Sequence, residues 1–191
     1  MAVRVTRLFL VRHGRAAAGW DVDPDPPLDD VGVRQAHEAA AELGRHPALD
    51  IVSSPLRRCR ETAAPLSVLW GRSPLIEPGV AEIPSPEGIA MADRVAWLRV
   101  AMQGRWADLG PRYTAFRDGV VRTVIDRAAA SPDGAVVVSH FIAINAVIGA
   151  AVGDDRLVLH SLDNASITEI EVADDRLALV SVGREADTLI R

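Results

Sequence analysis

Two unbroken apolar runs dominate the hydrophobic pattern of this chain. Residues 6–12 (TRLFLVR) and 135–140 (AVVVSH) each predict a buried strand, and residues 49–53 (LDIVS) predict a shorter one. Apolar and polar residues alternate over 165–172 (ASITEIEV) and 176–182 (RLALVSV), on either side of the tripeptide ADD. This alternation predicts two half-buried strands that pair as a hairpin.

Helical periodicity fills most of the intervals between these strands, with helices predicted over 30–45, 56–70, 90–104, 112–130 and 142–153. The first of them begins at an N-cap, Asp29 or Asp30, and has one apolar face, formed by Val33, Ala36, Ala40 and Leu43. His37 lies near this face and is expected to pack at the edge of the core.

Prolines mark two places where the regular pattern is expected to fail. Pro65 should kink the helix predicted over 56–70 or end its first part, because proline cannot donate the helical hydrogen bond. Residues 74–88 contain four prolines and two glycines. They are expected to form a loop around a short extended piece.

Strands that alternate with helices predict an α/β fold, here a three-layer α/β/α sandwich with a mostly parallel central sheet. The chain has 191 residues, which suits a single domain over residues 1–191. Within it, the segment 74–112 is expected to act as a cap or lid. Trp97 and Trp106 of this segment are expected in the core, with the alternative that one of them lines a pocket.

Composition narrows the class of protein. The chain is 49% hydrophobic and 25% charged, and none of its apolar runs approaches the length of a membrane-spanning helix or resembles a secretory signal. We therefore expect a cytoplasmic protein with no membrane partner. A net charge of −5 argues against a broad basic face for nucleic acid. The single cysteine, Cys59, provides neither an intramolecular disulfide nor a zinc site of several cysteines.

Polar residues gather where the predicted strands end. The strand at 6–12 ends in Arg12 and continues into His13 and Gly14, and the strand at 135–140 ends in His140. The third strand leads through Ser54 and Pro55 into two arginines, Arg57 and Arg58. Ligands of such sheets bind beyond the carboxyl ends of the strands, so these side chains are expected on one rim.

This set of side chains suits the transfer of a phosphoryl group. The planar fork of an arginine matches two phosphoryl oxygens at once. A neutral histidine can attack phosphorus and hold the group covalently, and a second histidine can donate hydrogen bonds as charge builds on the oxygens. Gly14 would let the backbone turn tightly after the nucleophile.

Four motifs in order, LFLVRHG, PLDDVGVRQA, SSPLRRCRETA and VVVSH, resemble those of the histidine phosphatase superfamily, the phosphoglycerate-mutase-like proteins. The resemblance covers residues 6 to about 170. It implies that His13 carries the phosphoryl group and that Arg12 and His140 bind it. It also assigns the family's second arginine to Arg58 in preference to Arg57.

The resemblance further implies an acidic proton donor ahead of the middle helices. The stretch GVAEIPSP resembles the family's L-x-E-I pattern, which selects Glu82, with Glu77 and Glu87 as neighbouring competitors. A free glutamate is mostly ionised at neutral pH. A pocket position beside a phosphate would raise its pKa and help it donate a proton to the leaving oxygen.

The chain also departs from the family pattern. Ala16 and Gly19 stand where many members have a hydroxyl residue and an asparagine that touch phosphate, and Phe141 replaces a common glycine. Arg15 replaces a common glutamate or glutamine. We therefore expect a substrate pocket, formed by Arg12, Arg58, Arg15 and Phe141, that is more apolar on one side and more basic on another.

The sequence thus predicts a phosphomonoester phosphatase that acts through a phosphohistidine on a phosphorylated small molecule or phosphoprotein. Arginines and histidines would supply the positive charge, so neither a metal nor another cofactor is expected. Two alternatives stay open: a metal-independent mutase of the phosphoglycerate type, and a non-catalytic module that binds a phosphorylated ligand. The chain lacks the extra length of the mutases, and Ala16 and Gly19 also argue against the mutase alternative.

Overall fold

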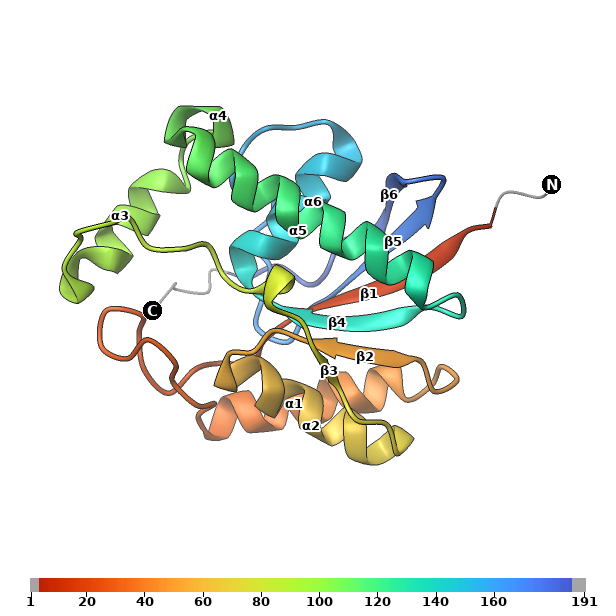
Figure 1. The fold of residues 1–191 in the computed structure, drawn as a ribbon. Coiled ribbons are helices and arrows are strands. Elements are labelled where there is room, and N and C mark those ends of the chain that lie inside the picture. The colour runs from red at the N-terminus through yellow and green to blue at the C-terminus, as the bar shows by residue number, and fades with distance from the viewer. Residues whose placement is uncertain (1–3, 187–191) are drawn as a thin grey trace.

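The computed structural model describes residues 4–186 and contains one six-stranded mixed sheet. The strands run in the order β3-β2-β4-β1-β5-β6 (Figure 1). β1, β2, β3 and β4 pair in parallel, while β5 is antiparallel to both of its neighbours. The strand bounds are β1 Thr6–Arg12, β2 Asp50–Ser53, β3 Leu75–Ile76, β4 Ala135–Ser139, β5 Ile167–Ala173 and β6 Arg176–Ser181.

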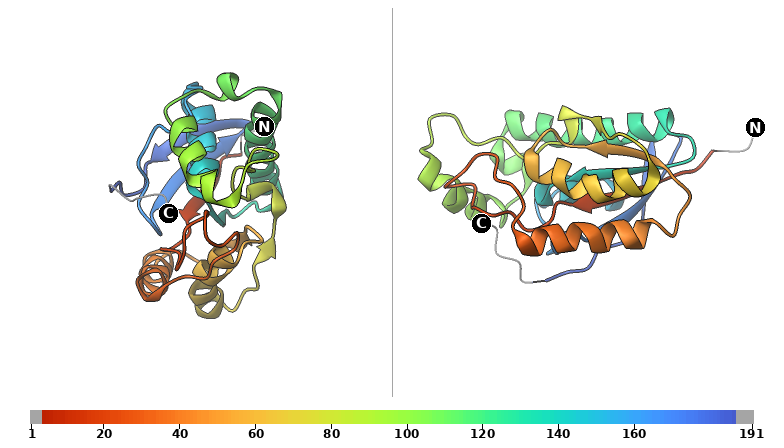
Figure 2. Two further views of the ribbon diagram at one scale, coloured as in Figure 1. Left: turned by 90° about the vertical axis from the view of Figure 1, so that its left-hand side faces the viewer. Right: turned by 90° about the horizontal axis from the view of Figure 1, so that it is seen from below.

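Helices cover both faces of this sheet. α1 (Asp30–Leu43) and α2 (Arg57–Trp70) pack side by side on one face, and α5 (Pro111–Ala130) and α6 (Phe141–Val152) cover the other (Figure 1). The shorter α3 (Arg94–Ala101) lies beyond the carboxyl ends of the strands, as the turned views in Figure 2 also show. The predicted α/β fold with a mostly parallel sheet is confirmed.

The remaining helical pieces lie in the segment between β3 and α5. They are α4 (Trp106–Leu109) and two 3₁₀ turns, η1 (Pro78–Val80) and η2 (Met91–Asp93). The helix predicted over 90–104 is therefore shorter, because its first turn is 3₁₀ and α3 ends at Ala101. The segment 74–112 also contributes β3 to the edge of the sheet.

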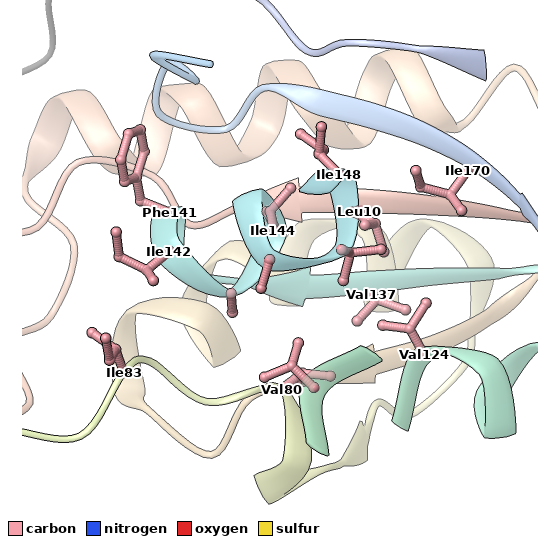
Figure 3. Close-up of a cluster of buried hydrophobic side chains, with 14 of the residues drawn as sticks. Leu10, Val80, Ile83, Val124, Val137, Phe141, Ile142, Ile144, Ile148 and Ile170 are labelled. Carbon is pink, nitrogen blue, oxygen red and sulfur yellow. The ribbon is translucent and has the colours of Figure 1, made fainter. Parts of the chain in front are cut away.

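Two separate cores result from the alternation of side chains along the strands. Leu8 and Leu10 of β1 belong to the larger core under α5 and α6, and Phe9 and Val11 belong to the smaller core under α1 and α2. Figure 3 shows part of the larger core, with apolar side chains of α6 over β1 and β4. Burial on both faces explains why these strands appear in the sequence as unbroken apolar runs.

Pro65 does not end its helix. α2 runs through it from Arg57 to Trp70. Its buried face includes Thr62, Ala63 and Leu66, on both sides of the proline. Packing of this face against the sheet offsets the one helical hydrogen bond that proline cannot donate.

The buried face of α1 differs in part from the predicted apolar face. Val33 is 44% exposed, and His37 is exposed rather than packed at the core edge. Ala36, Ala40 and Leu43 are buried as predicted, and Gly32 and Ala39 complete the buried face in place of Val33. All of the buried face except Leu43 is made of small residues, and Gly32 lets the first turn of α1 approach the loop after β1 closely.

Close packing, rather than an unusual backbone angle, explains the glycine at position 14. Its φ angle is not in the left-handed region, but a Cβ there would lie 2.6 Å from the Gly32 carbonyl oxygen. A Cβ on Gly32 would in turn lie 2.1 Å from the Arg15 carbonyl oxygen. The first turn of α1 thus packs directly against the backbone that follows His13, and neither Gly14 nor Gly32 has room for a side chain.

We expect Gly32→Ala to lower the free energy of unfolding by about 1–3 kcal/mol, because backbone atoms must move to admit the methyl group. Urea unfolding measures this. Gly119→Ala is the matched control, since a Cβ there meets nothing within 4 Å on α5. It should raise stability by about 0.5–1 kcal/mol through helix propensity. Equal effects of the two substitutions would contradict the packing argument.

Candidate active site

His13 and His140 are neighbours because β1 and β4 are neighbours. Arg12, the last residue of β1, pairs with Ser139, the last residue of β4. Each histidine follows directly, and the two rings lie 5.2 Å apart between centroids in an edge-on arrangement. The His13 N–H donates to the Ser139 carbonyl oxygen at 3.0 Å, which fixes this register beyond the strands.

Arg58 connects the two histidines. It lies in the first turn of α2, which follows β2 on the other side of β4. Its Nε donates to His13 Nε2 at 3.2 Å, and its Nη2 lies 3.2 Å from His140 Nδ1. The three side chains are buried. The adjacent strands β2, β4 and β1 thus bring together residues that are far apart in the sequence.

The hydrogen bonds determine which ring nitrogens carry protons. His13 Nδ1 lies 2.8 Å from the Gly14 carbonyl oxygen, which only accepts, so Nδ1 carries the proton. His13 Nε2 is then left with its lone pair. His140 Nδ1 faces the donor Arg58, so its proton is on Nε2, which lies 2.8 Å from Ser54 Oγ. The unprotonated nitrogen of His13 is therefore Nε2, and its lone pair accepts from Arg58 Nε in this structure.

Burial lowers the pKa of both histidines well below the ordinary range, and the Arg58 and Arg12 charges lower these pKa values further. Both rings are consequently neutral at pH 7. A neutral imidazole is the form that can attack phosphorus.

These pKa shifts predict a loss of stability in mild acid. The unfolded chain binds protons at its histidines below a pH of about 6.5, whereas the folded protein keeps His13 and His140 neutral. The free energy of unfolding should therefore fall as pH drops from 6.5 to 5, by up to about 1.4 kcal/mol per pH unit for each histidine.

Urea unfolding at several pH values measures this slope for wild type and for His13→Gln. The variant should have a shallower slope, because one of the two buried neutral rings is gone. Identical slopes would show that carboxylates elsewhere, rather than this site, control the acid sensitivity.

Arg12 is held by the loop that precedes β5. Its backbone N–H donates to the Ser166 carbonyl oxygen, and its guanidinium donates to the Leu162 carbonyl oxygen. The guanidinium carbon lies 4.9 Å from the centre of the Phe141 ring. Burial lowers the pKa of Arg12 to about 10, so the side chain is still a cation at neutral pH.

Glu82 is placed beside this cluster by the chain after η1. Ser139 Oγ donates to the Val80 carbonyl oxygen at 2.7 Å, which ties η1 to β4. Val80 and Ile83 are buried in the larger core (Figure 3). The glutamate between them receives a hydrogen bond from the Ile83 N–H at 2.9 Å and another from the Ile142 N–H at the start of α6.

Burial raises the pKa of Glu82, against the opposing effect of these N–H groups and of the Arg58 and Arg12 charges. The competing carboxylates have other partners. Glu77 caps η1 through the Gly79 N–H, and Glu87 pairs with Arg112 and is 90% exposed at its side chain. Glu82 therefore lies within electrostatic reach of Arg58 and Arg12.

Of the expected substrate-binding residues, Arg12, Arg58 and Phe141 lie close together, whereas Arg15 pairs with Asp29. Arg15 Nε donates to Asp29 Oδ2 at 2.6 Å, so its guanidinium ties the loop after β1 to the N-cap of α1. Its side chain is 39% exposed.

Three polar residues that support the site were missed from the sequence. Ser54 partners His140, Thr62 Oγ1 accepts from the Gly14 N–H at 2.9 Å, and Asn164 Nδ2 donates to the His13 carbonyl oxygen at 3.2 Å. Ser54 stands inside the motif SSPLRRCRETA, which could have drawn attention to it. Asn164 carried no sequence signal, because only the tertiary structure brings it beside His13.

Within residues 4–186, no three histidine, cysteine or acidic side chains form a group that could hold a metal ion. Cys59 is buried, with its Sγ 3.3 Å from His140 Nε2, and burial raises the pKa of its thiol to about 12. Of the helices described, none is long and apolar enough to cross a membrane.

Comparison with known proteins identifies the class that this fold and site define. The family model of the histidine phosphatase superfamily (branch 1) matches residues 8–185, and the chain belongs to this superfamily. The expected resemblance is thereby confirmed. Among named relatives, a glucosyl-3-phosphoglycerate phosphatase of Mycolicibacterium vanbaalenii is 31% identical over 88% of this chain and 85% of its own.

A Yersinia pestis protein named "Probable phosphoglycerate mutase GpmB" is 32% identical, but over only 40% of this chain and 38% of its own. Solved structures share the fold over nearly the whole chain. Bacillus stearothermophilus YhfR has a TM-score of 0.79 at 19% identity, covering 97% of this chain and all of its own. A mycobacterial glucosyl-3-phosphoglycerate phosphatase has a TM-score of 0.75 at 24% identity, covering 95% and 100%.

Proposed function

We propose that this protein hydrolyses phosphomonoesters of small molecules by transferring the phosphoryl group to His13 and then to water. The observation that carries the proposal is the contact of Arg58 with both histidines. It places a guanidinium, a lone pair on His13 Nε2 and a second imidazole within one buried cluster. Superfamily membership supports the same chemistry.

In the first half of the reaction, His13 Nε2 would attack phosphorus opposite the leaving oxygen. A nitrogen–phosphorus bond forms while the ester phosphorus–oxygen bond breaks. Glu82, whose pKa is raised by burial, would act in its protonated form and give its proton to the leaving oxygen, so that a neutral alcohol departs. The Gly14 carbonyl oxygen would hold the Nδ1 proton of His13 and stabilise the charge that the ring gains.

In the second half, water would attack phosphorus from the side that the alcohol has left. Glu82 is now a carboxylate and would take a proton from that water as the nitrogen–phosphorus bond breaks. Inorganic phosphate leaves, and His13 and Glu82 return to their starting protonation states. Atoms and protons balance over the two halves, with one water consumed for each ester.

Arg12, Arg58 and His140 would bind the three phosphoryl oxygens. Arg12 is a cation at neutral pH and is held by the Leu162 carbonyl oxygen before substrate arrives, so it can stabilise charge with little reorganisation. Arg58 would exchange its contacts with the two histidines for contacts with phosphate. For His140 to donate to an oxygen, its Nδ1 must carry a proton once Arg58 turns to phosphate. The Ser54 hydroxyl can accept from or donate to Nε2, and so it suits either state of the ring.

Two further points concern the substrate. The relative that spans most of this chain is a glucosyl-3-phosphoglycerate phosphatase, which favours hydrolysis of a phosphorylated small molecule.

We also propose that part of the segment 74–112, namely η2, α3 and α4, covers the leaving group, because α3 projects beyond the strand ends beside the loop after β1 (Figures 1 and 2).

Hydrolysis of p-nitrophenyl phosphate by the purified protein, with a metal chelator present, tests the proposal. Quenching the reaction in denaturant should trap protein-bound phosphate that is labile in acid and stable in base, as expected of a phosphohistidine. Turnover that chelation abolishes, or turnover without any trapped phosphate under several quench times, would contradict the mechanism.

A further inference from the structure

The nucleophile and the proton donor of the proposed reaction lie on separate elements. His13 directly follows β1, whereas Glu82 follows η1 in the segment between β3 and α5. Both steps of the reaction need the Glu82 carboxyl group close to the oxygen that leaves or attacks on the far side of phosphorus from His13. The rate therefore depends on how precisely these two elements are held relative to each other.

Ser139, the last residue of β4, contacts both elements. Its carbonyl oxygen accepts from the His13 N–H at 3.0 Å, and its Oγ donates to the Val80 carbonyl oxygen at 2.7 Å. Val80 ends η1, shortly before Glu82. The backbone of Ser139 thus holds the nucleophile, and its side chain holds the turn that leads to the proton donor.

Burial keeps the bond between Ser139 and Val80 made. Ser139 is 3% exposed and Val80 is 1% exposed, and the Val80 side chain packs in the larger core (Figure 3). A hydroxyl or carbonyl group that is buried without a partner costs free energy. The position of η1 on β4 is therefore fixed before substrate binds.

The junction of β4 and α6 also holds the Glu82 carboxylate, through the Ile142 N–H in the first turn of α6. The tie to Ser139 fixes the course of the backbone, and the tie to Ile142 fixes the carboxylate. η1 has a further contact with α5, where a Cβ on Gly79 would lie 2.3 Å from Thr123 Oγ1. Loss of the Ser139 hydroxyl should therefore displace Glu82 slightly without releasing its segment.

We propose that Ser139 is a positioning residue that holds Glu82 where it can exchange a proton with the leaving alcohol and with the attacking water. The proposal rests on the phosphatase function proposed above and deepens it. Ser139 acts through Val80, to which its hydroxyl donates, and not by contact with the substrate. It serves both steps, because Glu82 gives a proton in the first and takes one in the second.

Ser139→Ala, assayed with two aryl phosphates, tests the first step. Phenol is a weaker acid than p-nitrophenol, so phenyl phosphate needs the proton from Glu82 more than p-nitrophenyl phosphate does. We expect kcat/KM to fall by about 10-fold to 100-fold for phenyl phosphate and by about 3-fold or less for p-nitrophenyl phosphate. Ser139→Thr keeps the hydroxyl and should recover most of the loss.

The second step is tested with p-nitrophenyl phosphate alone. In Ser139→Ala, water should remove the phosphoryl group from His13 more slowly, because the displaced Glu82 is then a poorer base. kcat and KM should fall together while kcat/KM changes little, and the amount of protein-bound phosphate trapped by quenching should rise. A general loosening of the active site would lower the trapped phosphate instead.

Ser131→Ala is the matched control. Ser131 is also a buried serine, and its hydroxyl donates to Asp50 Oδ2 at 2.8 Å, at the opposite end of β2 from the site. This variant should keep the wild-type ratio of rates for the two aryl phosphates. In the double variant Ser139→Ala/Glu82→Gln, the loss for phenyl phosphate should not exceed that of Glu82→Gln alone, since the proton donor is already absent.

Equal losses for the two aryl phosphates with Ser139→Ala, or losses that multiply in the double variant, would overturn the positioning role. Circular dichroism establishes that each variant is folded. Failure of the phosphatase function itself is distinguishable, because wild type would then not hydrolyse p-nitrophenyl phosphate at all.

Discussion

Replacing His13 with alanine is expected to lower kcat/KM for p-nitrophenyl phosphate by about 10⁴-fold or more. Removing the nucleophile of a covalent mechanism leaves only binding and electrostatic stabilisation, and losses of this order are typical. The two arginines and His140 would still bind phosphate in the variant. Its Kd for inorganic phosphate should therefore change much less than its rate.

Steady-state kinetics and phosphate binding by calorimetry measure the two quantities. His37→Ala is the matched control, because this histidine is exposed on α1, and its rate should equal that of wild type. Circular dichroism establishes that both variants are folded. Retention of more than a few per cent of activity by His13→Ala, with no trapped phosphate in wild type, would rule out His13 as the nucleophile.

Glu82→Gln is expected to lower kcat/KM for an alkyl phosphate by about 10²-fold to 10⁴-fold. The amide preserves the shape of the side chain but has no acidic proton to give to the leaving oxygen. p-Nitrophenolate is a good leaving group that needs little help from a proton, so the loss with p-nitrophenyl phosphate should be much smaller. Comparing the two substrates separates proton donation from a general loss of structure.

The pH profile provides a second measurement of the same role. Burial raises the pKa of Glu82, and the first step needs its protonated form. For the alkyl phosphate, kcat/KM should therefore fall as pH rises through that pKa, and Glu82→Gln should lose this limb of the profile. Glu77→Gln and Glu87→Gln are the controls, since each has another partner. Either of them reproducing the loss would reassign the proton donor.

Much of the fold could be predicted because its signals are local. The unbroken apolar runs of β1 and β4 and the alternation in β5 and β6 follow from how many faces of each strand are buried. β3 was expected only as a short extended piece, because its two residues carry no periodicity and pair only once they meet β2. The helix predicted over 56–70 is present, and Pro65 does not end it, because packing of α2 outweighs the local cost of the proline.

The sequence by itself determined the residue types that end the strands, and thus which side chains meet at the carboxyl edge of a parallel sheet. Arg12, His13 and His140 could be placed there because strand direction follows from the α/β order of the elements. Membership of the histidine phosphatase superfamily also followed from the sequence, since its motifs stand in the expected order.

Only the tertiary structure decided how these groups are connected. The order β2-β4-β1 lets Arg58 contact both histidines, and the tie between Ser139 and Val80 holds η1 on β4, with Glu82 near Arg58 and Arg12. Arg15, in contrast, is held by Asp29. Hydrogen-bond partners and pKa shifts depend on distances between segments far apart in the chain, and a local pattern of hydrophobic and polar residues contains no information about those distances.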